Sequence, residues 1–215
     1  MKTRLSKTCF GISAAFLLCA APAAAQDTVE ADAAKAGTVP PRDVAVGAYT
    51  GIFDAYNRGA LVGIQARYRL GVFEAGGFGE VGTEGFTYYT GFGATAGLAW
   101  RTSFGLRLAA SGALGIHAYE NVGARFLSAD PGADGTTPFA GARVGASYIF
   151  GRRQNHVELG MMGVYEGDLT RSTVTTYYLQ DDWFDDSPRA MTSTHTLGTH
   201  RFGALVTVGW TRDLL

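Results

Sequence analysis

Hydrophobic and polar positions alternate strictly along residues 104–119, FGLRLAASGALGIHAY. One alternate set is wholly apolar, whereas the other is mostly small and includes Arg107, Ser111 and His117. Successive side chains of a β-strand point to opposite faces, so this period of 2 predicts a strand with one apolar face. The same alternation recurs in the segments 60–70, 72–82, 88–100, 139–150, 155–165 and 200–210. These are preceded by a less regular segment, 44–54, whose two faces the pattern does not assign.

These eight segments predict an all-β fold. Each is at least about as long as the 9–11 residues that a tilted strand needs to cross a bilayer, and an even number suits a closed antiparallel barrel. Charged residues make up only 17% of the chain, which is low for a soluble domain. We therefore predict that residues 43–215 form a single eight-stranded antiparallel transmembrane β-barrel with up-and-down topology.

The connections between the predicted strands differ in length. Short ones are expected near Gly71, at 101–103 and at 151–155, and the longest at 119–138 and 166–198. If the N-terminus lies in the periplasm, the short turns face the periplasm and the two long loops face outside, as in membrane barrels.

The N-terminus predicts export. Residues 1–25 combine three basic residues, an apolar run and an Ala-x-Ala cleavage site, which is the pattern of a signal peptide. Residues 26–42 are polar and alanine-rich and end in a double proline, so we expect a disordered periplasmic lead-in. Both cysteines, Cys9 and Cys19, fall in the signal peptide, so the mature chain has no disulfide or cysteine metal site.

Aromatic residues gather at one end of the predicted strands, on their apolar faces. The topology above places this end at the periplasmic interface, a depth that aromatic rings prefer. A soluble barrel that binds a ligand in an apolar interior, as lipocalins do, gives no reason for such a rim. The predicted periplasmic girdle consists of Tyr68, Phe73, Trp100, Phe104, Tyr148, Phe150 and Trp210.

In this pattern of strands, turns and aromatic residues, residues 43–215 resemble the small outer-membrane β-barrels, of the eight-stranded kind typified by OmpA. The resemblance implies a place in the outer membrane of a Gram-negative bacterium, in contact with membrane lipid and lipopolysaccharide. One difference is the C-terminus, GWTRDLL, because such barrels often end on an aromatic residue and the last one here is Trp210.

The faces opposite the apolar ones carry charged residues that would line the barrel interior. A narrow lumen requires such charges to pair or to stay hydrated. They could form an ion-pair plug that holds the strands in register, or they could line a small gated pore. The expected network is Arg67, Arg69, Glu74, Glu80, Arg107, Arg143, Glu158 and Arg201, with His117 and His156 nearby.

No other group of residues makes a site. Asp181, Asp182, Asp185 and Asp186 match no calcium-loop spacing, and we expect a solvated loop. On a strand, His195 and His200 would face opposite sides, which is against a metal site. The mature chain is slightly acidic, which is against nucleic acid. We therefore predict no catalytic residue, no cofactor and no metal.

The expected function is structural or adhesive, with the loops 119–138 and 166–198 as the surface that meets an extracellular partner. One alternative is a narrow pore for small solutes. Another is a lipid-modifying outer-membrane enzyme, which needs a serine, a histidine and a carboxylate to converge; the nearest grouping in the sequence is Ser111, His117 and Glu120.

Overall fold

The computed structural model describes residues 41–214 apart from 55–57, 125–129, 153 and 183–184. Arg42–Leu215 form one compact unit. The predicted signal peptide (1–25) and nearly all of the predicted lead-in (26–42) lie outside the described residues, so both stay predictions. Within the described part of the chain, no helix is long and apolar enough to cross a membrane.

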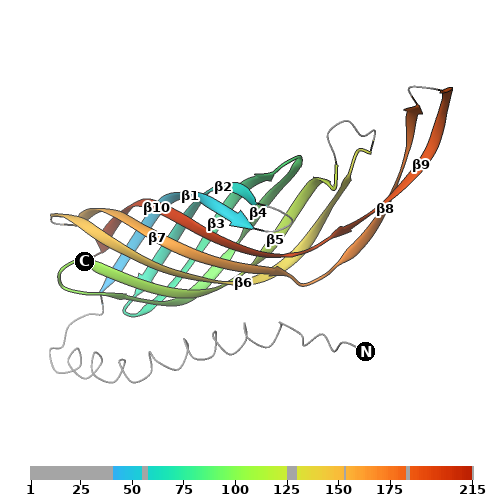
Figure 1. The fold of residues 1–215 in the computed structure, drawn as a ribbon. Helices are drawn as coiled ribbons and strands as arrows, with labels where there is room; N and C mark the ends of the chain where they lie inside the picture. Colours follow the sequence, from blue (N-terminus) through green and yellow to red (C-terminus); the bar gives the residue numbers. More distant parts are fainter. Residues whose placement is uncertain (1–40, 55–57, 125–129, 153, 183–184, 215) are drawn as a thin grey trace, which may run out of the picture. The chain divides into compact units, whose positions relative to one another are not determined.

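Eight long strands form a closed antiparallel barrel (Figure 1), which confirms the predicted fold class. Consecutive strands are hydrogen-bonded neighbours around the wall, in the order β1-β2-β3-β4-β5-β6-β7-β10, and β10 returns to β1. The strands are β1 (Arg42–Asp54), β2 (Arg58–Leu70), β3 (Phe73–Glu84), β4 (Thr87–Arg101), β5 (Leu106–Val122), β6 (Ala133–Arg152), β7 (Asn155–Asp168) and β10 (His200–Leu214).

The first and last strands of the chain close the barrel. β1 pairs with β10 along its whole length, from Arg42 opposite Leu214 to Asp54 opposite Phe202. No edge of the eight-stranded sheet is therefore left unpaired, and closure satisfies backbone groups that an open sheet would expose.

Side chains alternate across the wall: the outer face is apolar, whereas the inner face combines charged groups with buried aromatic and aliphatic side chains such as Phe53 and Leu205. Ile64 and Met161 on the outer face are 67% and 68% exposed, whereas Arg143 and Glu158 on the inner face are 3% and 4% exposed. A soluble barrel differs on both counts, because its outer face is polar and its interior rarely buries charged groups. The pattern fits a protein whose outer face is covered by something other than water.

The structure assigns the faces of β1, which the sequence left open. Tyr49 and Phe53 point inward and are almost fully buried, whereas Val46 and Ile52 point outward. Glycines on neighbouring strands make room for the large inward rings, because a Cβ at Gly63 would overlap the ring of Tyr49. Small inward residues are therefore required where a narrow barrel holds tyrosine side chains.

The turns at one end are short, as predicted. Gly71 lies in the turn between β2 and β3 with φ of 62°, and Gly105 lies in the turn before β5 with φ of 98°. Backbone in this left-handed region favours glycine because a side chain would clash. Phe104 lies in the same turn as Gly105, so the prediction of Phe104 as a strand residue is wrong.

The long connections at the other end contain more strand than predicted. β5 continues to Val122 and β6 begins at Ala133, which shortens the predicted loop 119–138. Most of the predicted loop 166–198 is a two-stranded hairpin that projects beyond the barrel (Figure 1), formed by β8 (Ser172–Asp182) and β9 (Asp185–Leu197). The expected solvated loop at Asp181–Asp186 thus lies at the ends of two paired strands.

Candidate functional site in the barrel interior

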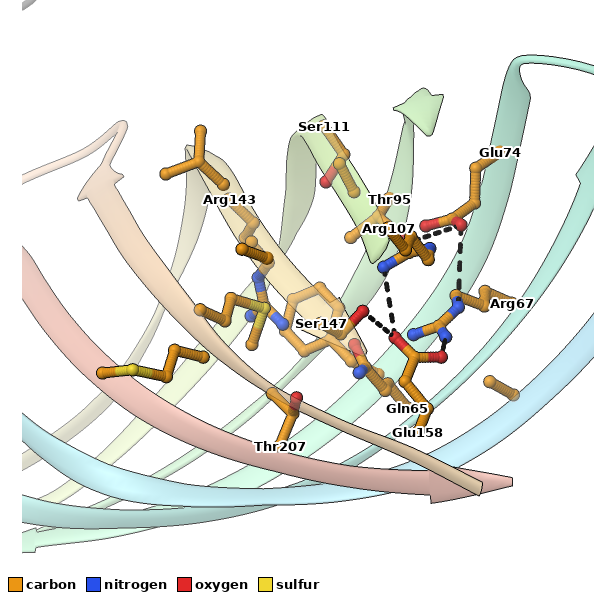
Figure 2. Close-up of a pocket in the computed structure, with 18 of the residues that line it drawn as sticks. Gln65, Arg67, Glu74, Thr95, Arg107, Ser111, Arg143, Ser147, Glu158 and Thr207 are labelled. Atoms are coloured by element: carbon orange, nitrogen blue, oxygen red, sulfur yellow. Dashed lines mark hydrogen bonds and ion pairs between the residues drawn. The ribbon is translucent and has the colours of Figure 1, made fainter. Parts of the chain in front are cut away.

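Four of the predicted interior charges form one cluster near the short turns, which we call the turn-end cluster: Arg67, Glu74, Arg107 and Glu158 (Figure 2). They come from β2, β3, β5 and β7, so the cluster joins strands around the whole barrel. Arg67 and Arg107 each pair with both glutamates; the Nη1 of Arg107 lies 3.4 Å from Glu158 Oε1. Two positive and two negative groups balance each other.

Two hydroxyl groups also donate hydrogen bonds to the carboxylate of Glu158. Ser147 donates to Oε1 over 2.5 Å, and Thr211 donates to Oε2 over 3.1 Å. A buried carboxylate is tolerated where charge-assisted hydrogen bonds replace its water. The turn-end cluster therefore ties β6 and β10 to the same point.

Arg69 lies apart from the turn-end cluster. Its Nε donates to Oδ2 of Asp43 over 2.6 Å, and both residues are buried. Sequence reasoning missed Asp43 because it lies at the start of the strand whose faces could not be assigned.

A second set of charges lies toward the long connections, and we call it the loop-end cluster: Glu80, His117, Arg143, Glu166 and Arg201. Arg143 Nη2 lies 3.1 Å from Glu80 Oε2 and 2.6 Å from Glu166 Oε1. Arg201 Nη2 lies 2.5 Å from Glu166 Oε2 and 3.4 Å from Glu80 Oε1. Each arginine thus bridges the same two carboxylates.

Aromatic rings enclose the loop-end cluster. The guanidinium carbon of Arg143 lies 3.5 Å from the centre of the Phe78 ring, and that of Arg201 lies 4.1 Å from the centre of the Tyr89 ring. Cation–π contacts of this kind are worth more where water is excluded. The rings therefore shield the two guanidinium groups from solvent.

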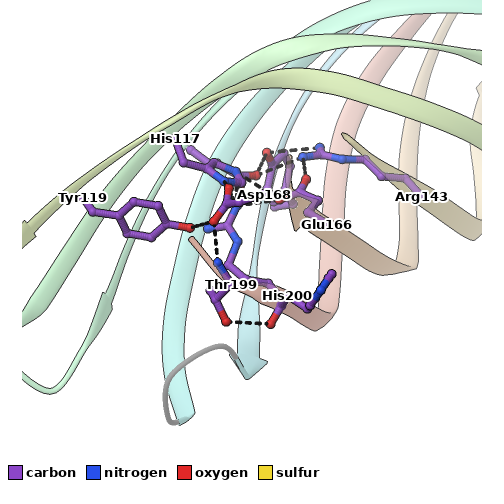
Figure 3. A network of polar contacts seen from close by, with 10 residues as sticks. His117, Tyr119, Arg143, Glu166, Asp168, Thr199 and His200 are labelled. Carbon is purple, nitrogen blue, oxygen red and sulfur yellow. Dashed lines mark hydrogen bonds and ion pairs between the residues drawn. The ribbon is translucent and has the colours of Figure 1, made fainter. Parts of the chain in front are cut away.

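His117 connects the loop-end cluster to the base of the long hairpin (Figure 3). Its Nδ1 lies 2.8 Å from Oδ1 of Asp168, and its ring stacks on Phe139. Oδ2 of Asp168 accepts hydrogen bonds from the Tyr119 hydroxyl (2.6 Å) and the Thr199 backbone N–H (2.8 Å). Asp168 ends β7, so it holds the point where the chain leaves the barrel.

Glu80, His117 and Glu166 also have the donor atoms of a metal site, all within 4.8 Å of one another. The guanidinium of Arg201, however, contacts all three side chains. A cation is therefore already present among these ligands, and the arrangement acts as an ion-pair centre.

A small cavity of about 50 Å³ reaches both clusters (Figure 2). Its lining includes Arg107 of the turn-end cluster, Arg143 of the loop-end cluster and the hydroxyl side chains of Thr95, Ser111 and Thr207. A polar cavity of this size has room for a few water molecules. The cavity thus connects the two clusters of ion pairs.

Glu166 and Asp168 are the main interior residues that sequence reasoning missed. It assigned both to the loop 166–198. Glu166 has the same parity as Glu158, so extending the predicted segment 155–165 by one residue places it on the inner face. That signal was available, but the strand end was set at residue 165, three residues before Asp168.

The predicted aromatic girdle lies on the outer surface. All seven side chains are exposed, and they belong to strand ends or turns at the short-turn end. At the opposite end the structure shows a second group that sequence reasoning missed, made of exposed Phe86, Tyr88, Tyr165 and Phe202. Two aromatic bands therefore border the apolar outer face.

The grouping considered for an enzyme does not converge. Ser111 and His117 face the interior, whereas Glu120 is exposed on the outer face of β5. His195 and His200 also have separate partners, because His195 Nε2 lies 3.1 Å from Asp130 Oδ1 and His200 Nδ1 lies 3.0 Å from the Tyr165 hydroxyl.

Asp130 fastens the base of the β8–β9 hairpin to the β5–β6 connection. It accepts hydrogen bonds from the Gly132 N–H and the Thr176 hydroxyl besides its contact with His195. Burial would raise the pKa of Asp130, but hydrogen bonds from Ser193, Gly132 and His195 outweigh it and lower the pKa below its ordinary value of 3.8.

A pH dependence follows from Asp130. A carboxyl whose pKa is lowered by folding stabilises the folded form above its unfolded pKa and loses this effect as the pH falls through its folded pKa. We expect the hairpin base to stay protected from hydrogen exchange between pH 7 and 4 and to lose protection below about pH 3.8. Exchange mass spectrometry measures this, and Asp130→Asn should abolish the pH step; an unchanged step would contradict the assignment.

Comparisons with known proteins give similarity in fold only. No protein-family model matches the chain, and no curated protein matches it. Neisserial surface protein A (NspA) is 13% identical, with 80% of this chain and 97% of that chain covered and a TM-score of 0.48. Ail, the attachment invasion locus protein of Yersinia pestis, is 14% identical over 79% of this chain and 99% of that one, with a TM-score of 0.34.

The outer membrane protease OmpT from Escherichia coli is 8% identical over 82% of this chain and 98% of that one, with a TM-score of 0.30. All three scores are below 0.5. The assignment of the fold therefore rests on the strand order and register of this chain.

Proposed function

We propose that this chain is an integral outer-membrane barrel of a Gram-negative bacterium that acts as a surface-interaction protein. The observation that carries the proposal is the distribution of side chains: buried ion pairs lie in the interior, and apolar side chains cover the outer wall between two aromatic bands. In water this arrangement would expose a large apolar surface. In a bilayer the same surface is solvated by lipid, and closure satisfies every strand edge of the barrel wall.

The height of the apolar wall supports a membrane location. On β4 the outward side chains run from Tyr88 to Trp100, a span of about 40 Å along the strand at roughly 3.3 Å per residue. A strand tilt of about 40° reduces this to roughly 30 Å, the thickness of a bilayer core. With the short turns in the periplasm, the second aromatic band lies at the outer leaflet, where the protein would meet lipopolysaccharide.

The β8–β9 hairpin and the β5–β6 connection form the surface through which we propose the protein acts. They lie at the end opposite the short turns (Figure 1), and the hairpin carries Tyr177 and Leu179, which are 78% and 63% exposed. Large apolar side chains on a projecting, membrane-distal element favour contact with a partner. This corresponds to the loops 119–138 and 166–198 expected from the sequence.

Membrane fractionation tests the location. We expect the protein in the outer-membrane fraction, with a band that shifts on a gel after boiling because the closed barrel resists unfolding in detergent. Protease added to intact cells should cut within the hairpin and leave the barrel. A soluble periplasmic protein without a heat shift would overturn the proposal.

A narrow pore is the second candidate function, and the polar cavity between the two clusters favours it. Arg143 packed on Phe78 borders this cavity and narrows the lumen. We expect little conductance from the wild-type protein in planar bilayers and a several-fold increase for Arg143→Ala. Thr207→Ala, which alters the cavity lining without removing an ion pair, is the control; equal conductance of all three would exclude gating by Arg143.

We also propose that the protein has no catalytic role. The separation of Ser111 and His117 from Glu120 supports this. Mass spectra of lipid A from cells with and without the protein should be identical, and a new lipid A species would contradict it.

A further inference from the structure

One edge of β8 is open. β8 pairs with β9 along one side, and among the described residues no strand pairs with its other side. Its central segment, STVTTYYLQ (172–180), has no charge, no proline and no glycine, and most of its residues are β-branched or aromatic. An exposed strand of this composition is a template for pairing with another strand.

The matching edge of β9 is protected. Between the pairs Gln180–Arg189 and Asp182–Asp185, one residue of β8 faces three residues of β9, so β9 bulges there. Pro188 lies in this bulge and offers no backbone N–H. Bulges and prolines are features that prevent edge pairing, and the hairpin has them on β9 alone.

We propose that β8 pairs antiparallel with β8 of a second copy of this chain. A two-fold axis perpendicular to the sheet keeps each side chain on its own face, so paired positions must have the same parity. The register with Thr176 opposite its own copy meets this condition. It pairs Thr175 with Tyr177 and Val174 with Tyr178, and β-branched residues opposite aromatic ones stabilise sheets.

Charge selects the same register. The register with Thr176 opposite its own copy places Arg171 across from position 181, an aspartate, at both ends of the β8–β8 pair. Opposite charges at paired positions are favourable, whereas a parallel, in-register pair would set Arg171 against Arg171 and aspartate against aspartate. The edge is therefore complementary to itself only in the antiparallel sense.

Antiparallel pairing determines where the second copy must be. β8 runs from the barrel rim toward the hairpin tip (Figure 1), so the partner's β8 runs toward this barrel. Two barrels paired in this way stand in two membranes that face each other. The inference rests on the proposed function as a surface barrel and gives its partner: the same protein on a neighbouring cell.

Reciprocal charge reversal tests the pairing. Arg171→Asp makes both ends of the β8–β8 pair acidic, and Asp181→Arg makes both ends basic. Cells that carry either variant alone should settle about tenfold more slowly than wild-type cells, because many weakened pairings act together between two cells. A mixture of the two strains restores opposite charges at both ends. We expect the mixture to aggregate at the wild-type rate, as mixed clumps of two fluorescent colours.

Arg189→Asp is the matched control, because it makes the same charge change on β9 and should leave settling unchanged. Cells without the protein should be excluded from the clumps. If the strains fail to co-aggregate, or if cells lacking the protein join the clumps, pairing between copies is wrong. Surface protease cleavage and the heat shift, measured on each variant, show separately whether the proposed location holds.

Discussion

Replacing Glu166 with alanine should lower the free energy of unfolding by about 3–5 kcal/mol, the cost of removing one partner from a buried ion pair. Glu166 accepts from Arg143 over 2.6 Å and from Arg201 over 2.5 Å, and it is 2% exposed. Without it, both guanidinium groups depend on Glu80. Urea titration of the protein in lipid vesicles, followed by tryptophan fluorescence, measures the change.

Two variants make this result specific. Glu166→Gln keeps an acceptor but removes the charge, and its loss should be smaller. Glu120→Ala removes an exposed glutamate from the outer face and should change stability by less than about 0.5 kcal/mol. If Glu166→Ala costs no more than Glu120→Ala, the loop-end cluster does not stabilise the barrel.

The second large effect concerns the outer face. Leu114 lies at the middle of β5 and is 64% exposed, so in water an arginine there would change stability by less than about 0.5 kcal/mol. In a bilayer, a charge at the midplane of a barrel wall costs about 2–4 kcal/mol. We expect Leu114→Arg to show the larger loss in lipid vesicles.

Leu179 on β8 provides the matched control, because it is 63% exposed but belongs to the projecting hairpin. Leu179→Arg should leave the unfolding free energy nearly unchanged. The difference between these two substitutions measures the membrane environment itself; equal effects would mean that Leu114 does not face lipid.

The sequence predicted the wall of the barrel well for a physical reason. A strand that separates lipid from a narrow interior must alternate apolar with small or charged residues, and this constraint is visible in every pair of neighbours. The alternation does not identify the faces of β1. There Ala45 and Gly47 inside alternate with Val46 and Ala48 outside, and all four residues are compatible with either face.

The hairpin and the two interior carboxylates Glu166 and Asp168 were harder to predict. β8 and β9 have no lipid on one side, so their residues need not alternate in polarity, and the segment resembles a loop. Glu166 and Asp168 lie where the strand leaves the apolar wall, and strand ends are set by tertiary contacts such as those of Asp168 with Tyr119 and Thr199. Charge pairing across strands likewise depends on register, which local sequence does not determine.

The seam between β1 and β10 has a consequence for synthesis. β1 and β10 are the first and the last barrel strands in chain order, so β1 cannot gain its second partner until β10 has been synthesised. A nonsense codon between the end of β7 and His200 would remove β10 and leave β1 and β7 each with an unsatisfied edge, so we expect such a product to be degraded. Loss of β10 alone should therefore behave as a null allele.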